Sequence, residues 1–270
     1  MTKAQINGFE MNYCIRGEGP TLVMAHGLMG NIATAVAGQS DPSHLLWNDF
    51  RVINYDARGH GESGYTTNPA DYHWSSLADD MHKLLLHLGV EKAHIGGGSM
   101  GAGTSIAFAL DHPQMVDKLV LFMPPPIVEK DFEITRLAFG GLASLIESRG
   151  LEKAVEVALG LGLWRDISET NPERFEWLRG WLLSQNPLSL VPAIRGLLID
   201  GPPLPQERLS EIKAPTLIIA HEGDPIHPIN SATILNKAIS GSRLTTAPDM
   251  FYWEQHMEEA AQIIRDFLKA

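Results

Sequence analysis

The run Gly96-Gly97-Gly98-Ser99-Met100-Gly101-Ala102 lies between an apolar stretch typical of a strand and one typical of a helix. It contains the pattern G-x-S-x-G, which indicates a sharp strand-to-helix turn that exposes a serine hydroxyl in a cleft. A turn this tight brings the helix and the strand together, so a side chain at Gly97 or Gly101 would collide with a neighbouring backbone. The backbone of Ser99 should be strained, as it often is at functional positions. We therefore expect Ser99 to be a nucleophile that attacks a carbonyl carbon.

The same glycines also fit a nucleotide-binding pattern. Gly96, Gly98 and Gly101 form G-x-G-x-x-G, the fingerprint of a dinucleotide-binding turn. That fingerprint is accompanied by an acidic residue near the end of the following strand, about 20 residues on. Here the next strand-like run, 117–123, is followed by prolines, and Asp117 stands at its beginning. The residues therefore favour the serine turn over nucleotide binding.

Composition excludes several classes of protein. The chain has 270 residues, 44% of them hydrophobic, which suffices for a large core in one domain with an insertion. A formal net charge of −11 argues against nucleic-acid and anionic membrane partners, because phosphates require Lys and Arg. We see neither a secretory signal nor a run of about 18 apolar residues that would span a membrane. The single cysteine, Cys14, excludes an intramolecular disulfide and fits a reducing compartment, so we expect a cytoplasmic protein.

Strand and helix patterns alternate along most of the chain. Two short strands are predicted within 4–16, and further strands at 21–25, 51–56, 92–95, 117–123, 214–220 and 242–246. Helices are predicted at 77–88, 101–110, 231–238 and 252–268. This alternation indicates an α/β fold with a mainly parallel sheet and helices on both faces. From about 124 to 205 only helical patterns occur, which predicts a lid over the strand ends where ligands bind in open α/β sheets.

Four motifs, taken together, resemble those of α/β-hydrolases in order and spacing, and the resemblance covers nearly the whole chain. They are His26-Gly27-Leu28-Met29-Gly30, the D-x-R-G-x-G-x-S loop at 56–63, the serine turn, and Gly223-Asp224-Pro225-Ile226-His227-Pro228. The resemblance implies an eight-stranded sheet, a core of residues 1–124 and 206–270, and a helical cap of residues 125–205. Serine at the turn points to the carboxylesterase and lactonase branch, because dehalogenases and epoxide hydrolases carry aspartate there.

The resemblance also implies a Ser-Asp-His triad. Ser99 would be the nucleophile and Asp224 the carboxylate, with turn capping as the alternative role for Asp224. In most relatives a Gly-His pair follows the last strand, but this sequence has none. His256 has the required chain order and is our predicted base. His227 lies three residues from Asp224, which is too close for the usual partner.

Other site residues follow from the same resemblance. The backbone N–H groups of Leu28 and Met100 would form the oxyanion hole. Met29 and Trp164 are our candidates for substrate binding. Asp56 and Arg58 would brace their loop. We expect no metal and no cofactor, since the sequence has no H-E-x-x-H, C-x-x-C or EF-hand spacing.

The predicted activity is hydrolysis of a small-to-medium hydrophobic ester or lactone. The apolar character of the lid supports this substrate class, since ligand sites are mostly apolar. Two alternatives stay open. One is carbon–carbon bond hydrolysis of a vinylogous diketone, because Gly-Gly-Ser-Met-Gly is also common among such enzymes. The other is a non-hydrolytic binding protein without a functional base, which the missing Gly-His pair favours.

Overall fold

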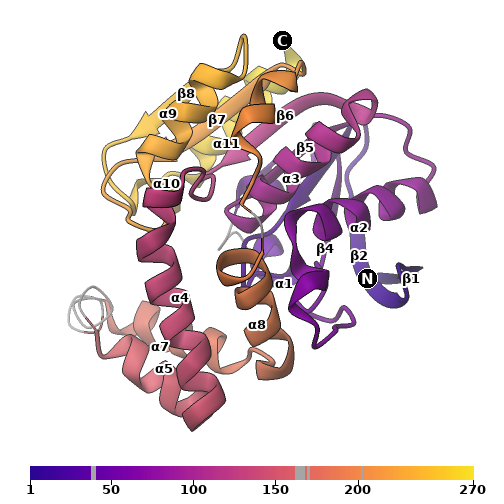
Figure 1. The fold of residues 1–270 in the computed structure, drawn as a ribbon. Helices are drawn as coiled ribbons and strands as arrows, with labels where there is room; N and C mark the ends of the chain where they lie inside the picture. Colours follow the sequence, from indigo (N-terminus) through magenta and orange to yellow (C-terminus); the bar gives the residue numbers. More distant parts are fainter. Residues whose placement is uncertain (38–40, 162–167, 169–170, 202) are drawn as a thin grey trace.

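A single mixed sheet of eight strands crosses the described part of the chain in the order β1-β2-β4-β3-β5-β6-β7-β8 (Figure 1). The computed structural model describes all residues except 38–40, 162–167, 169–170 and 202. The strands are β1 (Thr2–Ile6), β2 (Phe9–Arg16), β3 (Thr21–Ala25), β4 (Arg51–Tyr55), β5 (Ala93–Gly98), β6 (Val116–Phe122), β7 (Thr216–His221) and β8 (Arg243–Ala247). β2 pairs antiparallel with β1 and β4, and the other pairs are parallel. The predicted α/β fold class is confirmed.

The central strands read as apolar runs because both faces of the sheet are buried. Along β3, Val23 and Ala25 belong to one hydrophobic cluster, while Leu22 and Met24 belong to another on the opposite face. β6 and β7 alternate between the same two clusters. Side chains of a strand point to alternate faces, so a continuous apolar run supplies both cores at once.

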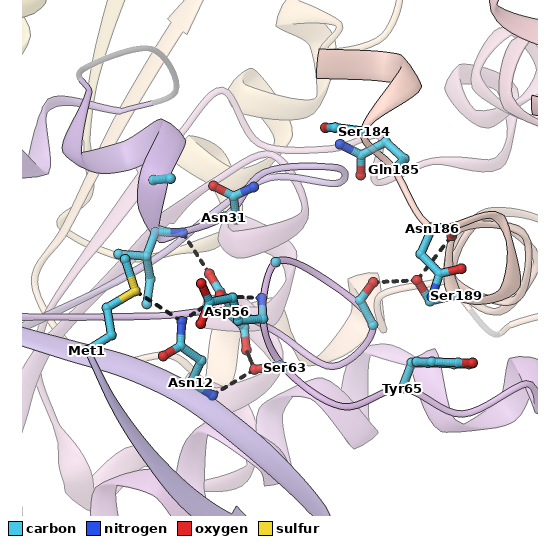
Figure 2. Close-up of a pocket in the computed structure, with 15 residues that line it drawn as sticks. Met1, Asn12, Asn31, Asp56, Ser63, Tyr65, Ser184, Gln185, Asn186 and Ser189 are labelled. Atoms are coloured by element: carbon cyan, nitrogen blue, oxygen red, sulfur yellow. Dashed lines mark hydrogen bonds between the residues drawn. The ribbon is translucent and has the colours of Figure 1, made fainter. Parts of the chain in front are cut away.

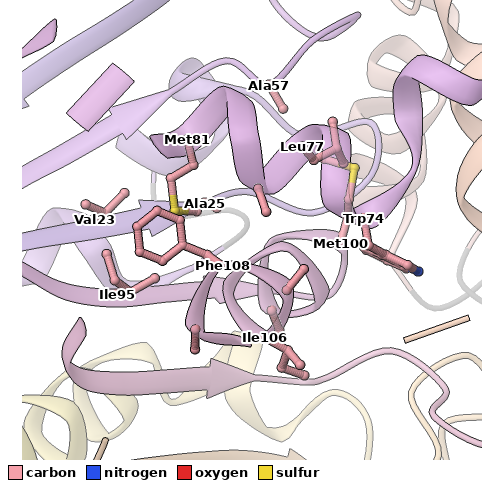
Figure 3. Packing of buried hydrophobic residues seen from close by; sticks show 14 of the residues in the cluster. Val23, Ala25, Ala57, Trp74, Leu77, Met81, Ile95, Met100, Ile106 and Phe108 are labelled. Carbon is pink, nitrogen blue, oxygen red and sulfur yellow. The ribbon is translucent and has the colours of Figure 1, made fainter. Parts of the chain in front are cut away.

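Helices cover both faces of the sheet. On one face lie α2 (Trp74–His87), α3 (Met100–Asp111) and α9 (Ile229–Ala238), whose buried side chains share a cluster with the strands. Figure 3 shows Met81 of α2 close to Phe108 of α3, and Trp74 and Leu77 of α2 next to Met100, the first residue of α3. The other face is covered by α11 (Met257–Lys269) and the short helix η1 (Pro42–Leu45). A further short helix, α1 (Ile32–Val36), follows β3, and η2 (Pro69–Tyr72) and η3 (Pro113–Met115) precede α2 and β6.

Between β6 and β7 the described residues form helices and no strand. These are α4 (Glu129–Arg149), α5 (Leu151–Leu159), α7 (Pro172–Leu183), α8 (Pro187–Ile194), η4 (Arg195–Ile199) and η5 (Gln206–Glu211). We call residues 129–199 the helical insertion. In Figure 1, α4 runs away from the sheet toward α5 and α7. The insertion has apolar clusters of its own, one of which includes Met29 of the core. The division into core and cap at 125–205 stays a prediction.

The C-terminal end of the chain differs from the predicted single helix. Residues 252–268 are split into α10 (Tyr252–Gln255) and α11, with His256 between them. The backbone of His256 has φ −129° and ψ 43°, which is not helical. No helix in the described ranges is both long enough and apolar enough to cross a membrane.

Candidate active site

The turn between β5 and α3 is built as the glycine pattern predicts. Ser99 stands between the strand and the helix with φ 51° and ψ −113°, an unusual conformation for a residue with a side chain. A Cβ on Gly97 would lie 2.5 Å from the carbonyl carbon of Gly101. A Cβ on Gly101 would lie 2.0 Å from the carbonyl oxygen of Ala25. Only glycine fits at either position, so the backbone holds Ser99 at the carboxyl end of the sheet.

The Ser99 hydroxyl begins a chain of two short hydrogen bonds. Its Oγ lies 2.8 Å from Nε2 of His227, whose Nδ1 lies 2.7 Å from Oδ2 of Asp224. An ionised carboxylate can only accept, so Nδ1 of His227 carries the proton and Nε2 has a free lone pair. Ser99 therefore donates to His227. Nucleophile, imidazole and carboxylate are connected in the order that a general base requires.

The structure corrects our prediction that His256 would meet Ser99. The His256 side chain is exposed, its ring stacks on Tyr252 with centroids 4.0 Å apart, and its Nδ1 lies 2.8 Å from the Tyr252 carbonyl oxygen. Trp253 instead turns inward from this segment, where it is 2% exposed and donates from Nε1 to the Ala220 carbonyl oxygen at 2.9 Å. His256 stands at the break between α10 and α11, where its backbone is not helical, and its side chain is exposed.

The turn after β7 supplies both partners of Ser99. Asp224 and His227 are three residues apart, and the backbone between them curls so that Ile226 N–H donates to Oδ1 of Asp224 at 2.7 Å. Residues at this spacing in a tight turn become neighbours, as in an Asx turn. Asp224 thus caps its turn with one oxygen and holds an imidazole with the other. The Asp-x-x-His spacing was visible in the sequence, but we had set His227 aside because it lies only three residues from Asp224.

Asp224 also accepts a hydrogen bond from a second imidazole. Nε2 of His221, the last residue of β7, lies 3.0 Å from Oδ2 of Asp224. Burial raises the pKa of the Asp224 carboxyl, but the hydrogen bonds from His221, His227 and the Ile226 N–H lower it by more. The net pKa of Asp224 lies well below its usual range, so the carboxylate stays ionised at neutral pH. His221 was not among the site residues that the sequence predicted.

The predicted oxyanion loop is held by the buried side chain of His26. The Ala57 N–H donates to Nε2 of His26 at 2.9 Å, so Nδ1 carries the proton and donates to the Gly27 carbonyl oxygen at 2.7 Å. Gly30 N–H closes a turn onto the same carbonyl oxygen at 2.9 Å, with Met29 at φ 65°. Burial lowers the pKa of His26, consistent with a neutral ring. This loop lies directly beside the nucleophile, because a Cβ on Gly27 would be 3.3 Å from that of Ser99.

Asp56 and Arg58 brace the neighbouring loop, as predicted. Oδ1 of Asp56 accepts from the Ile32 N–H at 2.7 Å, and Oδ2 accepts from Asn12 Nδ2 and from the Glu62 N–H, both at 2.8 Å. Arg58 binds the carboxylate of Asp80 on α2 through two nitrogens, at 2.6 and 2.9 Å. These contacts link the loop to β2, α1 and α2.

Of the two predicted substrate-binding residues, Met29 and Trp164, the structure describes only Met29. Met29 is 8% exposed and packs in a cluster with residues of the helical insertion. Its carbonyl oxygen accepts from Nε1 of Trp181 on α7 at 3.1 Å, so the oxyanion loop and the insertion are joined here. Trp164 lies outside the described residues. A substrate contact by Met29 stays a prediction.

A polar hollow of about 310 Å³ lies between the insertion and the core (Figure 2). Core residues such as Asn31 and Asp56 line it on one side, and Gln185, Asn186 and Ser189 on the other. Ser99 and His227 do not line it. The hollow is therefore distinct from the hydrogen-bonded chain at Ser99.

The side chains of His221, Asp224 and His227 also have the donor types of a metal site. Their ligand atoms lie within 4.8 Å of one another, close enough to face one cation. The hydrogen bonds described above join the same three side chains. The two arrangements exclude each other, because Nδ1 of His227 cannot donate to Asp224 and bind a cation at once. Since the hydrogen bonds have good geometry and continue to Ser99, we assign the three side chains to the hydrogen-bonded chain.

Known proteins resemble this chain in sequence and in fold. A family model described as the alpha/beta hydrolase fold matches residues 20–146. A Pseudomonas putida protein named 2-hydroxy-6-oxononadienedioate/2-hydroxy-6-oxononatrienedioate hydrolase 2 is 31% identical over 274 residues, covering 96% of this chain and 92% of its own.

Two solved structures are similar to this chain over essentially the full length. The enol-lactonase from Burkholderia xenovorans LB400 has a TM-score of 0.83 at 22% identity, covering 100% of both chains, and this likeness concerns the fold alone. A thermophilic esterase from Thermogutta terrifontis has a TM-score of 0.79 at 25% identity, covering 99% of this chain and 97% of that one.

Proposed function

Because the chain belongs to the α/β-hydrolase family, we propose that it is a serine hydrolase that forms an acyl-enzyme on Ser99. In this proposal His227 is the general base and Asp224 orients it. The observation that carries the proposal is the unbroken Ser99–His227–Asp224 chain, with contacts of 2.8 and 2.7 Å. A serine is a weak nucleophile until a base takes its proton, and in this proposal the His227 imidazole is that base.

In the proposed mechanism His227 makes each proton transfer. Nε2 of His227 takes the hydroxyl proton as Oγ of Ser99 bonds to the carbonyl carbon. The imidazolium so formed is stabilised by Asp224, and it returns the proton to the departing alkoxide oxygen. Water then attacks the acyl-enzyme with His227 again as base, which releases the acid and restores Ser99.

The oxyanion of each tetrahedral intermediate requires hydrogen-bond donors. Met100 is the first residue of α3, so its N–H has no acceptor within the helix and lies at the positive end of the helix dipole. We assign the second donor to the N–H of Leu28, in the loop that His26 holds. Preorganised donors of this kind usually make the largest single contribution to acyl transfer.

We propose a small-to-medium, uncharged and hydrophobic ester or lactone as the substrate. The residues that join the oxyanion loop to the insertion are apolar, with Met29, Leu28 and Phe139 in one cluster. An apolar surface favours a neutral acyl group over a carboxylate-bearing one.

Carbon–carbon bond hydrolysis is a second candidate. It is favoured by the Pseudomonas putida relative, whose name describes a hydrolase of 2-hydroxy-6-oxo dienedioates and trienedioates. Ser99, His227 and Asp224 would have the same roles. A side-by-side assay of a p-nitrophenyl ester, a γ-lactone and a vinylogous diketone distinguishes the candidates, and we expect the ester or the lactone to have the higher kcat/KM.

Fluorophosphonate labelling tests the base assignment directly, because such reagents modify serines that a base has activated. We expect the wild type to be labelled at Ser99 and Ser99→Ala to be unlabelled. His227→Gln should lose labelling and ester turnover by a factor of about 10³ or more. His256→Gln is the matched control, since it makes the same change at an exposed histidine, and it should label like the wild type.

Labelling with the opposite pattern, kept in His227→Gln and lost in His256→Gln, would refute the assignment of the base. A folded wild type that is not labelled at all would instead support the non-hydrolytic alternative. Peptide mass analysis identifies the modified residue, and circular dichroism confirms that each variant is folded.

A further inference from the structure

We propose that His221 is a positioning residue, which holds the Asp224 carboxylate in place through a second hydrogen bond to Oδ2. The proposal rests on the function proposed above, in which Asp224 orients His227. Nε2 of His221 lies 3.0 Å from Oδ2 of Asp224, the same oxygen that accepts from Nδ1 of His227 at 2.7 Å. The two imidazole rings meet edge to face, with centroids 6.3 Å apart and planes at 73°.

The short spacing of Asp224 and His227 explains why a second hydrogen bond to the carboxylate is needed. Both belong to one turn, and the Ile226 N–H of that turn already holds Oδ1 of Asp224. The turn alone would therefore fix the carboxylate and the imidazole only relative to each other. His221 belongs to β7 and pairs with Ala247 of β8, so it is fixed to the sheet. Its hydrogen bond ties the turn to the same sheet that carries Ser99.

The surroundings of His221 are apolar, so burying a polar side chain there lowers the stability of the fold. All six residues of β7 are buried, and the four residues before His221 are Leu217, Ile218, Ile219 and Ala220. His221 is 1% exposed, and its Nδ1 is buried with no hydrogen-bond partner among the described residues. An apolar side chain would avoid this unsatisfied atom. Among the described residues, the His221 imidazole makes one polar contact, in which Nε2–H donates to Asp224. We therefore infer that this hydrogen bond is the reason for a histidine at this position.

The contact also defines the tautomer of His221. Oδ2 of the ionised Asp224 only accepts, so Nε2 of His221 must carry its proton. A neutral ring then leaves Nδ1 without a proton. The proposal thus predicts an Nε2–H tautomer for His221 and an Nδ1–H tautomer for His227 in the resting protein.

A matched pair of variants tests the hydrogen bond. Glutamine and methionine have similar length and shape, and only the glutamine amide can donate as Nε2–H does. We expect His221→Met to lower kcat for an activated ester by ten- to a hundredfold with KM within about twofold, because the carboxylate is displaced. His221→Gln should recover kcat to within about threefold of the wild type. The rate of fluorophosphonate labelling should follow the same order.

Equal kcat values in His221→Met and His221→Gln would overturn the proposal, whether both are active or both are impaired. His227→Gln, assayed in the same series, separates this failure from failure of the proposed function. If His227→Gln is inactive while the two His221 variants are equal, only the role of His221 is refuted. If His227→Gln keeps its activity, the base assignment is refuted.

A measurement on the wild type keeps the test decisive if His221→Met does not fold. Nitrogen-15 NMR of the histidine rings identifies each tautomer, with His221→Gln used to assign the His221 signals. We expect a protonated Nε2 and a bare Nδ1 for His221 at pH 7.5. A protonated Nδ1 with a bare Nε2 would exclude the hydrogen bond to Asp224 and overturn the proposal.

Discussion

At the residue scale, burial determines the protonation state of two histidines. His26 and His60 lie with their ring centroids 5.1 Å apart, and they are 3% and 4% exposed. Burial lowers the pKa of both rings, and proximity to His26 lowers that of His60 further, to about 3. His60 therefore stays neutral in the folded protein, with Nδ1 donating to the Arg58 carbonyl oxygen at 2.9 Å.

We expect His60 to make the protein less stable in mild acid. In the unfolded chain a histidine titrates near pH 6.5, whereas folded His60 titrates near pH 3, so the unfolded state takes up the proton first. The stability that His60 contributes is therefore complete above pH 6.5 and is lost as the pH falls toward 3. At pH 5 the loss should be about 2 kcal/mol.

Urea unfolding of the wild type and of His60→Asn at pH 7.5 and pH 5.0 measures this loss. Asparagine can keep the donor to the Arg58 carbonyl oxygen but does not titrate. The decrease in the free energy of unfolding between the two pH values should be smaller in His60→Asn by about 2 kcal/mol. Equal decreases in the two proteins would show that His60 does not titrate between them.

The strand-turn-helix unit of β5 and α3 is the element on which the proposed chemistry depends. Its glycines allow β5, α3 and the end of β3 to approach more closely than any side chain permits. This close approach maintains the strained Ser99 conformation, because neighbouring elements hold the residue in place.

We expect Gly101→Ala to destabilise the fold by at least about 2 kcal/mol, since the new Cβ would lie 2.0 Å from the Ala25 carbonyl oxygen. Gly141→Ala is the matched control. Gly141 is inside α4, and a Cβ added there would meet no atom within 4 Å, so alanine should stabilise the helix by about 0.5–1 kcal/mol. Urea unfolding gives both values. A Gly101→Ala protein as stable as the wild type would contradict the packing described for the turn.

At the scale of the whole molecule, the helical insertion and the sheet are connected next to the nucleophile. Trp181 on α7 donates to the carbonyl oxygen of Met29, one residue from the proposed donor Leu28. The side chain of Met29 in turn packs among insertion residues. The position of the insertion is therefore coupled to the geometry of the oxyanion loop.

We expect Trp181→Phe to reduce kcat for ester hydrolysis by about fivefold, the equivalent of one lost hydrogen bond of about 1 kcal/mol. Trp177→Phe provides the control. Trp177 stacks on Trp181 with centroids 5.8 Å apart but is 37% exposed, so its replacement should leave kcat within about twofold. Steady-state kinetics with one ester substrate measures both. Equal kcat values in the two variants would show that the contact does not affect the oxyanion loop.

The local motifs of the sequence were sufficient to predict most of the strands and helices of the fold. The apolar run 21–25, the serine turn and the turn at 223–228 each specify a strand end through side-chain type and glycine spacing alone. The predicted strands agree with the observed ones to within one to three residues at either end. The last helix was mispredicted as continuous because the periodicity of 252–268 does not reveal the break at His256.

The sequence by itself determined the α/β class and the strained serine turn, because these depend on backbone sterics and on neighbours along the chain. Only the tertiary structure decided which imidazole meets Ser99. That choice depends on the break between α10 and α11, where His256 is exposed, and on the short turn after β7, which brings Nε2 of His227 to 2.8 Å from Oγ of Ser99. The contact of His221 with Asp224 likewise depends on where β7 ends in the sheet.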